Sequence, residues 1–86
     1  MENDKIACEI ILSLMSLYEF FEETNKLTKK YRRTKKNIDK LLKNNEFNDN
    51  TIKILKMISN NFKNNISSLK VIENNILNLT IKLKSL

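Results

Sequence analysis

The sequence has no glycine, proline or histidine and a single cysteine, Cys8, in 86 residues. Without glycine and proline, a chain can hardly build the tight turns that a many-stranded sheet requires. A single thiol excludes a disulfide within the chain, and the absence of histidine removes the usual ligands of a zinc cluster. We therefore expect an all-α protein with no cofactor and no metal.

The same absences argue against catalysis. No glycine is present to form a phosphate-binding loop or a nucleophile elbow, and no histidine can act as an acid or base. Neighbouring carboxylates such as Glu22 and Glu23 are typical of a solvated helix surface. Because every class of reaction needs a positioned acid, base, nucleophile or metal, we expect that the protein is not an enzyme.

Apolar runs are short. The longest of them, such as Ile10-Ile11-Leu12, cannot span a bilayer, so we expect no transmembrane segment. Glu2 and Asp4 occupy positions where a secretory signal carries positive charge. Together with the lone thiol, this predicts an intracellular protein, cytoplasmic or nuclear, that is not secreted.

Turn-forming residues cluster between Asn44 and Thr51, in the sequence NNEFNDNT. Asparagine is the best substitute for glycine at a helix end, and Asp49 or Asn50 can cap a following helix. We therefore predict one helical domain over residues 1–86, with a helix at about 4–44, a turn at 45–50 and a second helix at about 51–85.

Both predicted helices carry apolar residues at alternating steps of three and four, which place one stripe toward a partner helix. Paired antiparallel, the stripes form a long, coiled-coil-like hairpin with Leu27 near Leu69 and Tyr31 near Asn65. In the first segment the stripe comprises Ile6, Ile10, Leu17, Phe20, Leu27, Tyr31, Ile38 and Leu41. In the second segment it comprises Leu55, Ile58, Phe62, Leu69, Ile72, Ile76, Leu79, Leu83 and Leu86.

Residues 6–21 carry more apolar surface than one neighbouring helix can cover. The surplus predicts an interface with another copy, which gives a four-helix bundle, or with the helices of a different protein. The alternative is a bend near residues 22–28 that folds the surplus inside a three-helix bundle. The predicted interface residues are Cys8, Ile11, Leu14, Met15, Tyr18, Phe21, Leu77 and Ile81.

Charge is segregated along the chain. Residues 1–23 hold six carboxylates and one lysine, a net charge of −5, whereas residues 24–43 hold nine basic residues and Asp39, a net charge of +8. The basic segment is either a solvated helix surface or a patch for nucleic acid, an anionic membrane or an acidic protein. The residues of the candidate patch are Lys29, Lys30, Arg32, Arg33, Lys35 and Lys36.

These patterns favour a small structural, adaptor or regulatory subunit whose apolar amino-terminal helix face docks onto other helices. The alternative is a basic helical module that binds a nucleic-acid backbone or an anionic membrane without sequence preference.

Overall fold

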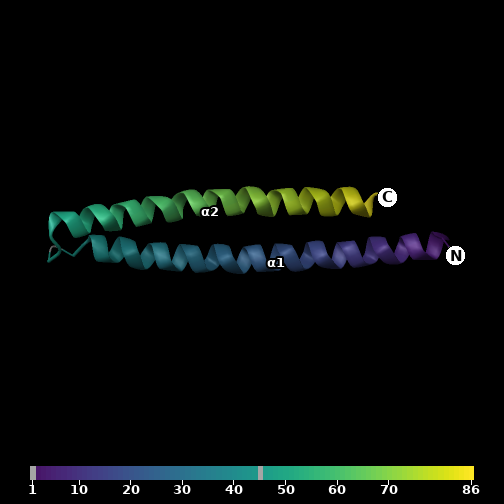
Figure 1. Cartoon of the computed structure of the whole chain (residues 1–86), viewed down its shortest axis with the longest axis horizontal. Coiled ribbons are helices and arrows are strands. Elements are labelled where there is room, and N and C mark those ends of the chain that lie inside the picture. Colours follow the sequence, from purple (N-terminus) through teal and green to yellow (C-terminus); the bar gives the residue numbers. More distant parts are fainter. Residues whose placement is uncertain (1, 45) are drawn as a thin grey trace.

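The computed structural model describes residues 2–44 and 46–86, which form two long antiparallel helices joined by a short turn (Figure 1). Helix α1 comprises Glu2–Leu42 and helix α2 comprises Asp49–Lys84. The molecule is a rod with extents of 69 × 14 × 14 Å and a radius of gyration of 19.8 Å. The predicted all-α helical hairpin is confirmed, and both helices begin about two residues earlier than expected.

Helix α1 continues without a break through residues 22–28, so the alternative of a bent three-helix bundle is wrong. This stretch contains no residue that stops a helix. The hydroxyl of Thr24 donates to the carbonyl oxygen of Phe20 at 2.7 Å, and Thr28 lies 2.8 Å from the carbonyl oxygen of Thr24. Each threonine thereby satisfies its polar group inside the helix, which lets the helix continue.

Asn48 caps helix α2. The backbone N–H of Thr51 donates to its side-chain oxygen at 2.8 Å, which satisfies one of the free donors of the first turn. The caps predicted at Asp49 or Asn50 are therefore wrong by one or two positions, because the helix begins at Asp49. Asn44 closes the other side of the turn by accepting from the N–H of Glu46 at 3.1 Å. Asn45, which belongs to the predicted turn, lies outside the described residues.

The two helices meet along one line of half-buried or buried residues, called the seam below. Its members recur at alternating steps of four and three on both helices, which is the pattern of an antiparallel coiled coil. On α1 the seam comprises Ile10, Leu14, Leu17, Phe21, Thr24, Thr28, Tyr31, Lys35, Ile38 and Leu42. On α2 it comprises Ile52, Leu55, Ser59, Phe62, Ile66, Leu69, Glu73, Ile76, Thr80 and Leu83.

The predicted stripes are partly wrong, because at several positions the seam takes a neighbouring residue instead. Phe20 and Leu27 of α1 are exposed, while Phe21 and Thr28 occupy the contact. On α2, Glu73 and Thr80 lie in the seam where Ile72 and Leu79 were expected. The sequence offers apolar residues on two adjacent lines of each helix, so the period alone does not choose between them.

Tyr31 packs edge-on against Phe62, with ring centroids 5.0 Å apart and an interplanar angle of 66°. The expected neighbour was Asn65, which lies one helical turn further along α2 and is exposed. Asn65 still borders a shallow hollow beside Tyr31. The predicted register is therefore right to within about one turn.

The described residues of the hairpin form no closed apolar core. Within residues 2–44 and 46–86, no hydrophobic side chain is fully buried, and the two buried residues are Thr28 and Thr80, which are 3% and 6% exposed. Two helices can cover only one side of each other, so their remaining apolar surface faces outward.

Candidate protein-docking surface

The middle of the seam is polar. The hydroxyl of Thr28 lies 3.1 Å from Oε1 of Glu73 and shares its hydrogen between that carboxylate and the carbonyl oxygen of Thr24. About three helical turns closer to the hairpin turn, the hydroxyl of Ser59 donates to Asp39 at 2.6 Å, and Lys35 forms an ion pair with the same carboxylate at 2.7 Å. The Thr28–Glu73 and Ser59–Asp39 bonds join α1 to α2 in a defined register, because a polar group in a seam needs its own partner.

Asp39 is held in its charged form. The hydrogen bond from Lys35, followed by the one from Ser59, lowers the pKa of this carboxyl below its ordinary value of 3.8. The carboxylate is partly open to solvent, so its bonds act mainly on register and on acid sensitivity.

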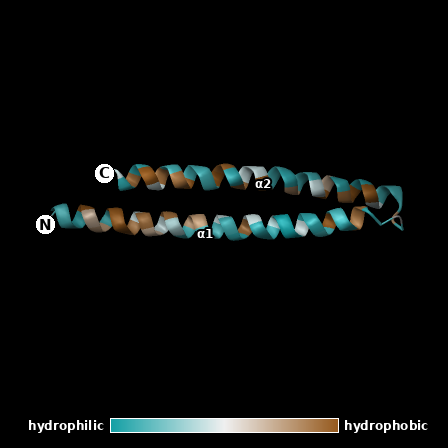
Figure 2. Ribbon diagram, turned by 180° about the vertical axis from the view of Figure 1, so that it is seen from behind, coloured by the Kyte–Doolittle hydropathy of each residue, from teal (hydrophilic) through white to brown (hydrophobic). Residues whose placement is uncertain are grey.

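Exposed apolar side chains gather in the half of the rod that holds both chain ends, called the open half below (residues 6–27 and 71–86). Figure 2 shows hydrophobic ribbon on both helices there and a mostly hydrophilic α1 toward the turn. Among the described residues, every large apolar side chain that is exposed lies in the open half except Leu41, Ile54 and Met57. Apolar surface of this extent is typical of an interface.

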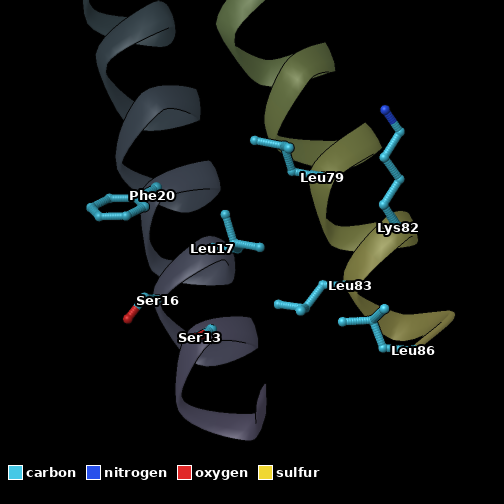
Figure 3. Close-up of a pocket in the computed structure, with 8 residues that line it drawn as sticks. All are labelled: Ser13, Ser16, Leu17, Phe20, Leu79, Lys82, Leu83 and Leu86. Atoms are coloured by element: carbon cyan, nitrogen blue, oxygen red, sulfur yellow. The ribbon is translucent and has the colours of Figure 1, made fainter. Parts of the chain in front are cut away.

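One apolar surface lies to one side of the seam, extends from the open half toward the turn, and is called the Phe20 face below. It comprises Ile6, Phe20, Leu27 and Leu41 on α1 and Ile72, Leu79 and Leu86 on α2, all exposed. Between the helices it forms an open groove of about 580 Å³ lined by Ser13, Ser16, Leu17, Phe20, Leu79, Lys82, Leu83 and Leu86. In Figure 3, Leu17, Leu79 and Leu83 point into the space between the helices, and Phe20 lies at the outer rim.

The other side of the seam carries a shorter apolar patch, called the Tyr18 face below. It comprises Cys8, Ile11, Met15, Tyr18, Leu77 and Ile81, all exposed. The ammonium of Lys84 lies 5.2 Å from the centre of the Tyr18 ring. Such a cation–π contact at an exposed site contributes about 0.5–1 kcal/mol and covers part of the ring.

Six of the eight residues predicted for the interface therefore lie exposed on the Tyr18 face. The other two, Leu14 and Phe21, are half-buried in the seam and pack toward α2, so their assignment to an outer interface is corrected. Sequence reasoning assigned Phe20, Leu27 and Leu79 to the hairpin contact and missed them as exposed surface. The seven-residue spacing from Phe20 to Leu27 places both on one line of α1 but does not tell which line α2 covers.

The basic segment lies on the half of α1 nearer the turn. Lys29, Lys30, Arg32, Arg33 and Lys36 are exposed, as expected for a patch. Lys35 turns instead toward the seam and is bound to Asp39, which removes it from the patch. A shallow hollow of about 440 Å³ is lined by Glu23, Lys26, Leu27, Lys29, Lys30 and Arg33. Its rim is therefore basic, and its apolar side chain is Leu27.

In the part of the chain that the structure describes, neither helix is long and apolar enough to cross a membrane, and no group of three or more potential ligands could hold a metal ion. Comparisons with protein-family models, curated proteins and solved structures find no significant match.

Proposed function

We propose that this protein is a non-enzymatic helical interaction subunit whose open half docks onto helices of another copy or of a partner protein. One observation carries the proposal: the exposed apolar side chains concentrate in the open half, while the hairpin itself buries no large apolar side chain among its described residues. Covering one such side chain contributes about 1.5–3 kcal/mol, so a docked helix pair gains several times that amount.

The structure favours protein docking over anion binding by the basic segment as the function to propose. The basic hollow contains Leu27 and Glu23 as well as cations, and a carboxylate at the rim opposes a phosphate ligand.

The proposal is tested by the mass of the protein in solution across a wide range of concentration. We expect sedimentation to give a mass above the 10.2 kDa of one chain. The double variant Tyr18→Ser and Phe20→Ser should lower the association constant by at least about a hundredfold, because aromatic anchors dominate interface energies.

The matched control is the pair Ile54→Ser and Met57→Ser, which changes two equally exposed apolar residues near the turn. This pair should leave the mass unchanged, and circular dichroism should show full helix content in both variants. A wild-type chain that remains a folded monomer at every concentration, and whose open half takes up no apolar dye, contradicts the proposal.

A further inference from the structure

The exposed row of α1 on the Phe20 side of the seam reads the same in both directions. At steps of seven residues it comprises Ile6, Ser13, Phe20, Leu27, Thr34 and Leu41, and all six are exposed. The order is apolar, hydroxyl, apolar, apolar, hydroxyl, apolar. The seam keeps the same seven-residue period, so the row stays on one side of the hairpin along its whole length.

Building on the docking function above, we propose that the Phe20 face binds a second copy of this chain, with the two α1 helices antiparallel. A two-fold contact brings the same surface of two subunits together, so the surface must match its own reversal. With the axis midway between Phe20 and Leu27, Phe20 meets Leu27 of the second copy and Ser13 meets its Thr34. At the ends, Ile6 meets Leu41.

The hydroxyl positions in this row do not leave an unpaired polar group at the contact. Ser13 donates to the carbonyl oxygen of Glu9 at 2.8 Å, and Thr34 donates to that of Lys30 at 2.9 Å. Each presents its small side chain with its donor already used inside its own helix, so the cost of excluding water from it is low.

The relief of the face fits the same arrangement. The groove of the open half lies at the level of residues 13–20, and the shallow hollow around Leu27, Tyr31 and Thr34 lies at the level of residues 27–34. Reversal of the second copy places the groove of one hairpin over the hollow of the other. The ring of Phe20, at the rim of the groove, then reaches the hollow around Leu27, Tyr31 and Thr34 of the second copy.

Charge favours the antiparallel orientation. The segment 1–23 has a net charge of −5 and the segment 24–43 has a net charge of +8, so reversal sets each segment beside its opposite. Near the axis, Glu19 and Glu23 of one copy come within about one helical turn of Lys26 and Lys30 of the other. Aligning the open ends would instead place the basic segment beside the first half of α2, residues 49–66, which is itself basic with Lys53, Lys56 and Lys63 against Asp49.

The face is also large enough. A surface 69 Å long and 14 Å wide offers roughly 970 Å², which compares with the about 800 Å² per partner that a stable complex buries. The paired hairpins form a four-helix bundle whose centre holds the apolar residues of the Phe20 face.

Cross-linking tests the arrangement. In a Cys8→Ser background, the variants Ser13→Cys and Thr34→Cys each carry one thiol. We expect little covalent dimer from either variant oxidised alone and efficient covalent dimer from their mixture, because residue 13 faces residue 34 of the second copy. Self-linking of Ser13→Cys would overturn the antiparallel arrangement.

Charge reversal gives a second test that does not depend on thiols. Lys26→Glu with Lys30→Glu should raise the dimer dissociation constant by roughly tenfold or more. Adding Glu19→Lys and Glu23→Lys to the same chain should restore binding, because each altered segment again faces its opposite. Failure of the four-site variant to recover, with its helix content intact, would contradict the proposed pairing.

The outcomes separate this inference from the proposed function. A dimer that survives Phe20→Ser with Leu27→Ser but dissociates on Ile11→Ser with Tyr18→Ser overturns the inference and leaves the docking function standing. A chain that is monomeric alone and forms a complex only with a different protein also overturns the inference and leaves the docking function standing. A folded monomer that takes up no apolar dye overturns both.

Discussion

Asp39 accepts one bond across the seam, from Ser59 of α2, and one from Lys35 of its own helix. Lys35 and Ser59 stabilise its charged form, so its pKa lies below the ordinary value of 3.8 in the folded state. A carboxyl whose pKa is lowered by folding stabilises the fold above its unfolded pKa and loses that contribution as the pH falls through the folded value.

We therefore expect Asp39→Asn to be less stable than the wild type above pH 3.8, with a difference that shrinks as the pH decreases below it. Urea unfolding at a series of pH values measures this difference. Ser59→Ala removes one of the two hydrogen bonds that lower the pKa of Asp39. The stability that ionised Asp39 contributes should then be lost over a narrower range of acid pH than in the wild type. A difference between wild type and Asp39→Asn that is constant across acid pH would contradict the assignment.

At the scale of the helices, the polar pairs of the seam fix the register of α1 against α2 but give less stability than apolar residues at the same positions. Thr28 and Glu73 occupy positions where a coiled coil usually has apolar residues. Replacing a hydrogen-bonded polar pair by well-packed apolar residues is often stabilising.

We expect the double variant Thr28→Val and Glu73→Leu to raise the free energy of unfolding by about 1–3 kcal/mol. The control is Lys29→Val with Asn74→Leu, which makes the same replacements at exposed neighbours and should stay within about 0.5 kcal/mol of the wild type. Thermal or urea unfolding followed by circular dichroism measures both. A lower free energy of unfolding in the Thr28→Val and Glu73→Leu variant would show that the Thr28–Glu73 hydrogen bond stabilises the hairpin more than the two apolar residues do.

The hairpin itself follows from the sequence, whereas the faces of its helices follow only in part. The missing glycine and proline and the NNEFNDNT cluster locate two helices and one turn with local information alone. The choice between Phe20 and Phe21, or between Ile72 and Glu73, depends on which line of side chains the other helix covers. Both of these rows of side chains carry apolar residues. The row that faces outward is therefore identified only by the contacts across the seam, such as the bonds of Asp39 and Glu73.

For the whole molecule, the association proposed above should be coupled to folding, because the described residues form no closed apolar core. A rod that buries no large apolar side chain among its described residues has a small hydrophobic stabilisation of its own. The docking proposed above would cover this apolar surface with a second hairpin, and a species that binds only the folded chain stabilises it by mass action.

We therefore expect the melting temperature to rise with protein concentration. Circular dichroism melts over a wide concentration range measure the shift, and the Phe20→Ser with Leu27→Ser variant should show a lower melting temperature that no longer depends on concentration. A wild-type melting temperature that is independent of concentration would indicate that the hairpin folds as a unit without a partner.

The two chain ends lie at the same end of the rod, and α1 extends past the end of α2 (Figure 1). An affinity tag or fluorescent label attached to either terminus would therefore stand beside the apolar open half and could shield it. A label at the opposite tip, on an exposed turn residue such as Glu46, would be separated from that end by most of the 69 Å length of the molecule. Probes of assembly are best placed there.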